Sequence, residues 1–393
     1  MRSAVIVDVI RSPSGRGKPG GALSGLHPVD LLATVLASLA ERSSLDPALV
    51  EDVIVGCVDQ VGEQALNVGR QAVLAAGWPE EVPATTIDRQ CGSSQQAAAF
   101  AAQGVIAGAY DIVIAAGVES MSRVPMGSAV AGSDFLGPSL RARYPEGLVN
   151  QGVAAELIAK RWSLSRDDLD EYAAESHRRA SAAARGGLFD SEILAVPLPD
   201  GTLHVSDETI RAATTVDGLR TLPASFDTAA MRARFPDLEW NVTAGNASPL
   251  TDGASGALIM EEGTAIKLGL TPRARFHSFA VCGDDPLFML TGPIPATARI
   301  LKKSGMTLDD IAVYEVNEAF ASVPLAWAHE WNADPARLNP RGGAIALGHP
   351  LGASGTRILA TLVNELEASA GQFGLQVMCE GGGMANATLI ERM

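Results

Sequence analysis

Short apolar runs alternate with longer alanine-rich stretches through the first third of the chain. Runs of this length and composition predict strands, whereas the alanine-rich stretches predict helices. The strand candidates are residues 4–10, 52–58, 84–90 and 111–118. The helix candidates are residues 28–42, 66–76 and 92–108. Strands and helices therefore alternate from the start of the chain.

The same alternation returns in the last third of the chain, so the chain is predicted to be duplicated. The second set of strand candidates is 274–282, 311–316, 341–347 and 375–379, with helices near 295–305, 319–331 and 352–369. Each half closes with one more apolar run, at 254–261 and at 387–392. The pattern predicts an α/β fold of two duplicated βαβαβαββ halves, each with a five-stranded mixed sheet covered by helices.

The middle of the chain breaks this alternation. It contains loops rich in Gly, Pro and Arg and one amphipathic helix, predicted over residues 166–185. We therefore divide the chain into an N-terminal half at 1–119, completed by 250–273, an inserted loop domain at 120–249 and a C-terminal half at 274–393. Long insertions in compact domains are often functional, and this one is suited to covering a ligand.

Composition and charge narrow the possible functions. The chain has 393 residues, 47% of them hydrophobic, and a net charge of −15 without any run of Lys or Arg, which argues against a nucleic-acid partner. The N-terminus is predicted to be a strand and not a signal peptide, so we expect a cytoplasmic protein. The apolar stretch at 97–118 is long enough to span a membrane, but its glycines and Tyr110-Asp111 divide it into a buried helix and strand.

The four cysteines are expected to be reduced thiols. Their spacing matches neither a disulfide framework nor a CxxC metal motif, and the six histidines are scattered, so no metal site is predicted. Two of the reactive residue types occupy matching places in the duplicated halves. Cys91 and His349 each follow the third predicted strand of their half and precede its third helix. A pseudo-twofold axis would bring this thiol and this imidazole together.

Cys91 lies in the segment DRQCGSSQQA at 88–97, where a strand leads into a helix start made of small residues. A helix N-terminus makes a thiol more acidic and presents N–H groups that can stabilise an oxyanion. A small buried core cysteine explains this segment equally well. His349 lies in GGAIALGHPLGASG at 342–355, and this density of glycines indicates close approach of the backbone to a ligand.

Two further segments carry polar groups at the ends of strands. Cys379 begins CEGGGMA, where a thiol next to three glycines suggests proton transfer, and Glu380 is expected to be solvated in the turn. Asn317 and Glu318 interrupt the apolar passage EVNEAFA at 315–321. Buried polar groups need partners, so both are expected to hold hydrogen bonds, with helix capping as the alternative.

These four segments, in this order, closely resemble the thiolase family, and the resemblance runs along nearly the whole chain. It implies a thiolase-like fold in α-β-α-β-α layers. It also implies roles for Cys91 as acyl-accepting nucleophile, His349 as its base and Cys379 as acid/base. Asn317 would anchor a water that forms one oxyanion hole with His349. The backbone N–H groups of Cys91 and Gly381 would form a second.

The resemblance further implies that coenzyme A is a substrate, that no cofactor is used, and that the protein is a homodimer or homotetramer. Candidate residues for binding substrate and CoA are Ser248, Ala247, Met121, Phe320 and Arg220. Family members usually carry Asn where Asp88 stands, and a basic residue where Pro223 precedes Ala224-Ser225-Phe226. Arg220 is the nearest arginine, so the CoA phosphate contacts are the least specified part of the site.

The implied reaction is CoA-dependent thiolytic cleavage of a 3-ketoacyl-CoA, or the reverse condensation, through an acyl-cysteine. The alternatives are a short-chain acetoacetyl-CoA thiolase and a non-catalytic relative that binds acyl-CoA. A cysteine hydrolase would leave Cys379 without a role, and a decarboxylating ketosynthase would require a histidine there. The segment LVNQG at 148–152 lacks the His-Met pair of short-chain biosynthetic members. This favours a degradative enzyme for larger or unusual acyl groups, ring-derived ones among them.

Overall fold

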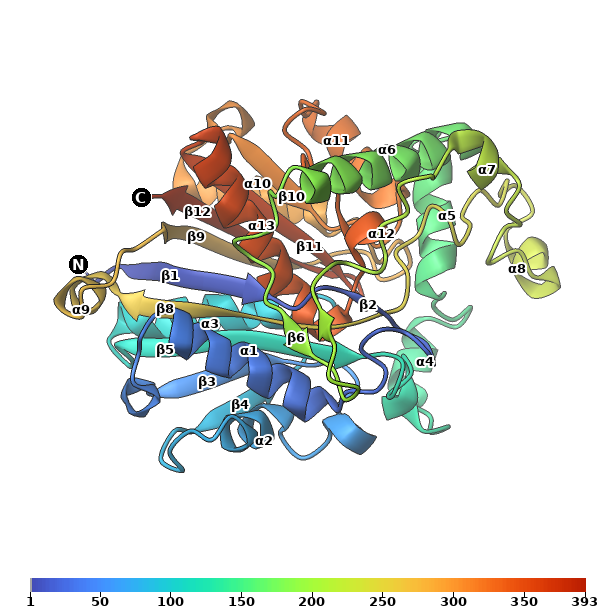
Figure 1. Ribbon diagram of the computed structural model, residues 1–393. Coiled ribbons are helices and arrows are strands. Elements are labelled where there is room, and N and C mark those ends of the chain that lie inside the picture. Colours follow the sequence, from blue (N-terminus) through green and yellow to red (C-terminus); the bar gives the residue numbers. More distant parts are fainter. Residues whose placement is uncertain (1) are drawn as a thin grey trace.

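A computed structural model describes residues 2–393 of the chain (Figure 1). The N-terminal half consists of five main strands and three helices, as its sequence pattern predicted. The strands are β1 (Ala4–Arg11), β3 (Asp52–Gly56), β4 (Ala84–Ile87), β5 (Ile112–Ser120) and β8 (Thr251–Glu261), with the short β2 (Gly15–Arg16) beside β8. The helices are α1 (Pro28–Arg42), α2 (Val68–Ala75) and α3 (Ser93–Ala107), and α9 (Glu262–Lys267) leads into the second half.

The C-terminal half has four strands among the described residues and not the five that we expected. The strands are β9 (Ala274–Gly283), β10 (Val313–Val316), β11 (Phe373–Glu380) and β12 (Met384–Arg392). The helices are α10 (Pro293–Ser304), α11 (Ser322–Trp331), α12 (Ala344–Leu347) and α13 (Ser354–Ser369).

The predicted strand at 341–347 is wrong, because most of it forms the short helix α12. Gly342 has a φ of +75° and Gly348 a φ of +85°, so the backbone is not extended at either end of the run. A side chain at Gly342 would clash with the backbone oxygen of Ser176, which shows how closely the inserted domain packs here. Where we expected this strand to pair with β10, residues 2–393 contain only one parallel bridge, between Tyr314 and Leu338.

The strands follow the order β10-β11-β12-β9-β1-β8-β5-β3-β4. The two halves join where β1 meets β9, but only through the pairs Val5 with Arg275 and Ile6 with Ala274. Each half therefore contributes one mixed sheet, and the two sheets are joined only at these two residue pairs. In both halves the short β3, β4 and β10 pair in parallel with their neighbours, whereas the long strands pair in antiparallel fashion.

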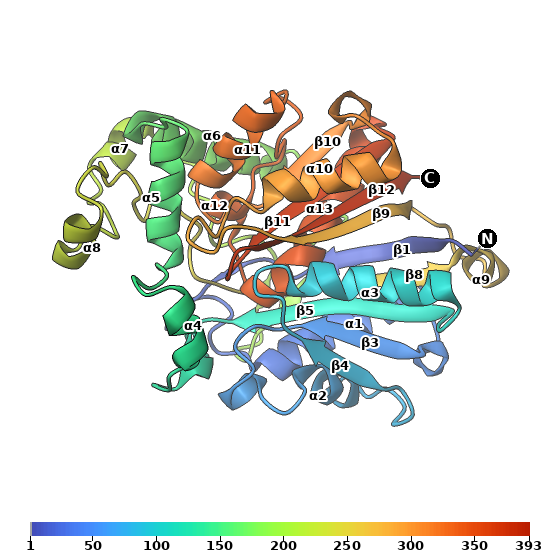
Figure 2. The same ribbon diagram turned by 180° about the vertical axis from the view of Figure 1, so that it is seen from behind.

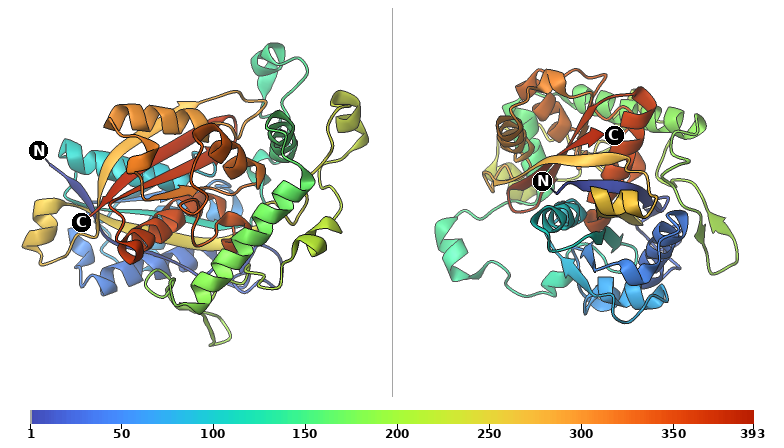
Figure 3. Two further views of the ribbon diagram at one scale, coloured as in Figure 1. Left: turned by 90° about the horizontal axis from the view of Figure 1, so that it is seen from above. Right: turned by 90° about the vertical axis from the view of Figure 1, so that its left-hand side faces the viewer.

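Helices α3 and α13 form the central layer of the molecule (Figure 3). They contact each other and strands of both sheets, whereas α1 and α2 cover the outer face of the first sheet and α10 packs on the second. Helix α3 is rich in alanine and is buried over most of its circumference. A helix without a wide polar face belongs inside a protein. The predicted α-β-α-β-α layering is confirmed.

The segment between β5 and β8 lies at one end of the layers, opposite the chain termini (Figure 2). Its elements are α4 (Gly137–Arg143), α5 (Gln151–Arg161), α6 (Arg166–Arg185), β6 (Val196–Pro197), β7 (Leu203–His204), α7 (Val216–Arg220) and α8 (Ala229–Arg234). Helix α6 has the predicted bounds and begins with a capping box between Ser165 and Asp168. The stretch around α4 projects away from the body of the molecule (Figure 3).

Buried charges anchor this segment to the core. Arg11, at the end of β1, is fully buried and bonds to Glu192 and to Asp207, each at 2.7 Å. Such close pairing offsets part of the cost of burying these charges, although the second oxygen of Glu192 has no hydrogen-bond partner among residues 2–393. Within residues 2–393, no helix is both long enough and apolar enough to cross a membrane.

Candidate active site

Cys91 lies in the tight turn between β4 and α3. Gln90, directly before it, has a φ of +50°, and the Ser93 hydroxyl accepts a hydrogen bond from the N–H of Arg89 at 2.8 Å. The thiol is buried against a small cluster of apolar side chains, Met121, Leu351, Ile358 and Met378. No side chain caps the N-terminus of α3, but the N–H groups of Gly92 and Ser93 already donate to the carbonyls of Arg89 at 3.1 Å and Gln90 at 3.0 Å, so the helix dipole, and not these two N–H groups, acts on a negative charge nearby.

Burial raises the pKa of Cys91 well above its ordinary value, and the charges of Cys379 and Glu380 add to this rise. The backbone N–H groups of Cys91 itself and of Gly381 act in the opposite direction, by hydrogen bonding to the sulfur. Cys91 therefore rests as a thiol and needs a base. The family resemblance implied that these same two N–H groups form an oxyanion hole, and both act on the Cys91 thiol.

His349 is held by one backbone hydrogen bond and one ring hydrogen bond. Its backbone N–H donates to the Thr251 hydroxyl at 3.0 Å, and its Nδ1 lies 2.6 Å from the Ser354 hydroxyl. That hydroxyl donates to the carbonyl of Pro350 at 3.0 Å, so it accepts from Nδ1–H. This tautomer leaves the lone pair on Nε2. Burial lowers the pKa of His349 to about 3, and Arg357 contributes to this, so the ring is neutral.

Asn317 links the imidazole to the second thiol. Its Nδ2 lies 3.5 Å from His349 Nε2, and its backbone N–H donates to the carbonyl of Val377 at 3.0 Å. Burial raises the pKa of Cys379 to about 12, while hydrogen bonds from the Asn317 side chain and the N–H of Ala319 oppose the rise. Cys379 is completely buried at the end of β11. A thiol with so high a pKa is suited to giving up a proton only when a strong base forms beside it.

Glu380 departs from expectation, because it is fully buried and not solvated in a turn. It lies on the face of β11 that points to α3, where a Cβ added to Gly92 would come within 1.9 Å of its Oε1. Burial raises the pKa of Glu380 to about 8, partly opposed by Arg89. Neither oxygen has a hydrogen-bond partner among residues 2–393.

The expectation that Glu318 holds hydrogen bonds is confirmed. Its carboxylate accepts from Ser176 at 2.7 Å and Tyr172 at 3.0 Å, both on α6, and from Asn339 at 3.0 Å and the N–H of Ile345 at 3.1 Å. These bonds tie the inserted segment to the loop before His349. Through these bonds Glu318 holds the segment before His349 in place.

Glu119 is a structural residue of the site that the sequence reasoning missed. Its buried carboxylate accepts from the backbone N–H groups of Val58 and Gly352, both at 2.9 Å, from Asp59 at 3.2 Å, and from the Gln64 amide at 2.8 Å. Gly352 belongs to the loop that carries His349. The signal available in the sequence was an acid directly following an apolar strand.

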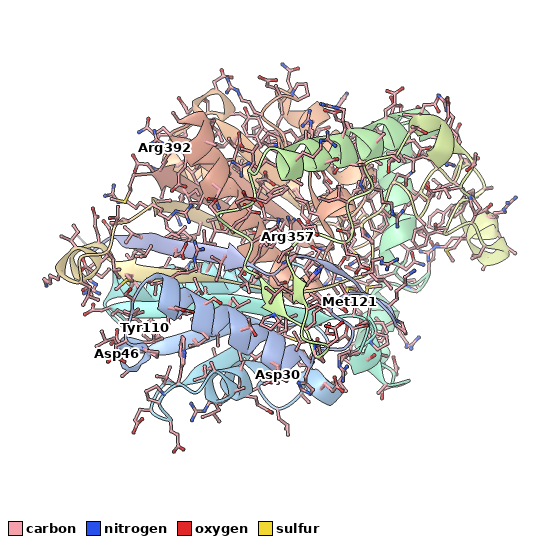
Figure 4. All side chains as sticks on the ribbon, viewed as in Figure 1. Asp30, Asp46, Tyr110, Met121, Arg357 and Arg392 are labelled. Atoms are coloured by element: carbon pink, nitrogen blue, oxygen red, sulfur yellow. The ribbon has the colours of Figure 1, made fainter. Side chains whose placement is uncertain are left out.

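Four of the five proposed substrate-binding residues lie beside the residues of the candidate site. Met121 lies on the side of the molecule that carries the inserted segment (Figure 4). It packs against Cys91, and its sulfur accepts from the N–H of Thr251 at 3.3 Å. Ala247 forms a bridge with Phe320, and the N–H of Ser248 donates to the carbonyl of Ala319 at 3.0 Å, so this segment lies beside the strand exit that carries Asn317.

Arg220 is not brought to this group by any contact in the described part of the chain. It lies on α7, and its half-exposed guanidinium bonds to Asp167 and Asp217, each at 2.8 Å. Within residues 2–393, no group of three or more His, Cys, Asp or Glu side chains is arranged to hold a metal ion.

Comparisons with known proteins cover the whole chain. The family models "Thiolase, N-terminal domain" and "Thiolase, C-terminal domain" match residues 4–263 and 270–392. The chain is 46% identical to the steroid 3-ketoacyl-CoA thiolase FadA6 of Mycobacterium tuberculosis, over 100% of this chain and 95% of that protein. It is 44% identical to the 3-ketoacyl-CoA thiolases of Photobacterium profundum and Vibrio cholerae, over 100% of both chains in each case.

Proposed function

The chain belongs to the thiolase family, and on that premise we propose that it is an acyltransferase that cleaves 3-ketoacyl-CoA with CoA. The products are acetyl-CoA and an acyl-CoA shortened by two carbons, and the reverse reaction is a Claisen condensation. The proposal is supported by a series of interactions between groups distant in the sequence: the Asn317 amide lies 3.5 Å from His349 Nε2 and acts on Cys379, and Cys379 in turn acts on Cys91 before α3. Full-length relatives named 3-ketoacyl-CoA thiolase support the same reaction.

In the first half-reaction, His349 Nε2 takes the proton from Cys91, and the thiolate attacks the 3-keto carbon of the substrate. The C2–C3 bond breaks, its electron pair forms the enolate of acetyl-CoA, and Cys379 protonates C2 of this enolate. The shortened acyl group remains on Cys91. Splitting the reaction in this way replaces one difficult step by two easier ones.

In the second half-reaction, the Cys379 thiolate takes the proton of incoming CoA, whose sulfur attacks the acyl-cysteine. The Cys91 thiolate leaves and recovers its proton from His349. Oxygen anions develop in both halves, and we assign one to the N–H groups of Cys91 and Gly381 and the other to His349 with an Asn317-bound water. A donor placed at such an oxygen lowers the barrier by about 3–4 kcal/mol.

For binding CoA, we propose that Ser248 and Ala247 line the pantetheine path beside Phe320. The ring of Phe320 packs edge-on against Phe226 at 6.1 Å between centroids, which supports an apolar wall there. Met121 would contact the substrate near Cys91. Arg220 is the weakest of these assignments, because two carboxylates already neutralise its guanidinium.

We propose a degradative enzyme that accepts larger acyl groups, including ring-derived ones. The support is the segment LVNQG at 148–152, without the His-Met pair, together with the relative named for a steroid substrate. We also propose a cytoplasmic homodimer or homotetramer, which light scattering of the purified protein would test. A panel of 3-ketoacyl-CoA thioesters of increasing size, assayed for thiolysis, should show the highest kcat/KM above the four-carbon member. Preference for acetoacetyl-CoA would instead indicate the short-chain activity.

The central experiment follows acylation by mass spectrometry. After incubation with acetyl-CoA, the parent should carry one acetyl group on Cys91, Cys91→Ala none, and Cys379→Ala should still acylate slowly. Cleavage of acetoacetyl-CoA should require added CoA and should consume one free thiol for each molecule cleaved, because both products are acetyl-CoA; a hydrolase would instead release free thiol. Acylated Cys91→Ala protein would refute the assignment, and CoA-independent release would indicate a hydrolase. A protein that binds acyl-CoA but never acylates would be a non-catalytic relative.

A further inference from the structure

The carboxyl of Glu380 occupies the space that a side chain at Gly92 would fill, at the N-terminus of α3. Its Oε1 lies so close that an added Cβ would come within 1.9 Å. The side chain is fully buried, and neither of its oxygens has a partner among residues 2–393. Buried acids are normally paired or hydrogen-bonded, and an unpaired one needs a reason.

The groups that face Glu380 come from several elements. Asp88 and Arg89 follow β4, Cys91 precedes α3, and Cys379 and Cys282 lie on β11 and β9. Arg89 is the sole cation among these groups, and no ion pair or hydrogen bond joins its guanidinium to Glu380 in the described part of the chain. A carboxylate here would be poorly compensated.

The thiolate of Cys91 depends for its stability on the same N-terminus of α3. A thiolate at position 91 is stabilised by the positive end of the α3 dipole and by the N–H of Gly381. A negative charge on Glu380 would occupy that positive end and would repel the thiolate across a buried, low-dielectric region. The two anions therefore compete for one site.

We propose that Glu380 controls the nucleophile through its charge: the neutral carboxyl permits ionisation of Cys91, and the carboxylate opposes it. The proposal rests on the proposed function only in taking Cys91 as the nucleophile. Because burial raises the pKa of Glu380 to about 8, the neutral form predominates at pH 7 and is lost in mildly alkaline solution. In alkaline solution the Glu380 carboxylate therefore opposes ionisation of Cys91, an effect that a glutamine at position 380 would not have.

The test compares the parent with Glu380→Gln, which is isosteric with the protonated acid and cannot ionise. The rate of alkylation of Cys91 by iodoacetamide is followed from pH 6.5 to 10 by peptide mass spectrometry. The two proteins should react alike at pH 7, and Glu380→Gln should react about tenfold faster at pH 9.5, which corresponds to about one unit of Cys91 pKa. If the protein turns over a 3-ketoacyl-CoA, the alkaline limb of kcat/KM should extend upward in the variant.

The matched control is Glu391→Gln. Glu391 pairs with Phe373 at the other end of β11 and β12, far from α3. The Glu391→Gln variant therefore loses one carboxylate elsewhere on the same strands, and the pH dependence of Cys91 alkylation should match that of the parent. A ratio of Glu380→Gln to parent that is constant across the pH range overturns the proposal. So does failure of both Glu380→Gln and Glu380→Met to fold, since the site would then require the charge. Alkylation needs no acyl-CoA, so a protein without thiolase activity still gives an answer.

Discussion

Replacing Glu119 by Gln removes one buried charge and sets the NH2 of the new amide against hydrogen-bond donors. Oε1 accepts from the N–H of Asp59 and the Gln64 amide, with the Cys57 thiol also at 3.9 Å, and Oε2 accepts from the N–H groups of Val58 and Gly352. The amide NH2 of glutamine must face one of these donor pairs, so at least two bonds are lost in either orientation. Hydrogen bonds to charged groups contribute about 1.5–3 kcal/mol each, so the expected loss is about 3–6 kcal/mol.

The loss can be measured as a fall in Tm. With an unfolding entropy of about 2.1 cal/mol/K per residue over 393 residues, 3–6 kcal/mol lowers Tm by about 4–7 °C. The variant also frees Gly352, in the loop of His349, so alkylation of Cys91 at pH 7 should slow.

Glu156→Gln is the matched control. Glu156 is a buried acid in which each oxygen accepts one backbone N–H, from Asn241 at 2.8 Å and Val242 at 2.7 Å. It should lose about half as much stability, and Cys91 should react as in the parent. If Glu119→Gln melts no lower than Glu156→Gln and its Cys91 reacts normally, Glu119 does not hold the histidine loop.

Three further outcomes are expected. Burial lowers the pKa of His177 to about 4, so between about pH 4 and 6.5 the unfolded chain binds one proton more than the folded protein. The stability of the fold therefore falls as the pH falls through that window. The Tm of His177→Gln should drop less between pH 7 and 5 than that of the parent, and an equal drop would contradict this. Gly152→Ala would place a methyl group 2.1 Å from the ring of Phe226, so KM for CoA should rise several-fold, whereas Gly25→Ala, with only Pro199 at 3.9 Å, should leave it unchanged. Ser354→Ala removes the acceptor for His349 Nδ1–H, so kcat should fall about 10- to 100-fold with little change in KM, and an unchanged kcat would show that another group fixes the tautomer.

The sequence by itself determined the elements and their duplication. Strands and helices follow from local periodicity, which is why α1 and α6 begin and end where the pattern placed them. The matching places of Cys91 and His349 followed from the repeat. The segment 341–347 misled because its apolar run suits a strand or a buried helix equally, and the glycines and contacts with α6 decide between them.

Only the tertiary structure decided the environment of the charged groups. Glu119, Glu318 and Glu380 are all acids next to strand ends, and nothing local distinguishes them. Glu119 meets backbone and amide donors, Glu318 meets α6, and Glu380 faces Gly92 at the start of α3 and is left without a hydrogen-bond partner in the described chain. Hydrogen-bond satisfaction and desolvation depend on segments brought from far along the chain, so they set the pKa of each group after the fold has formed.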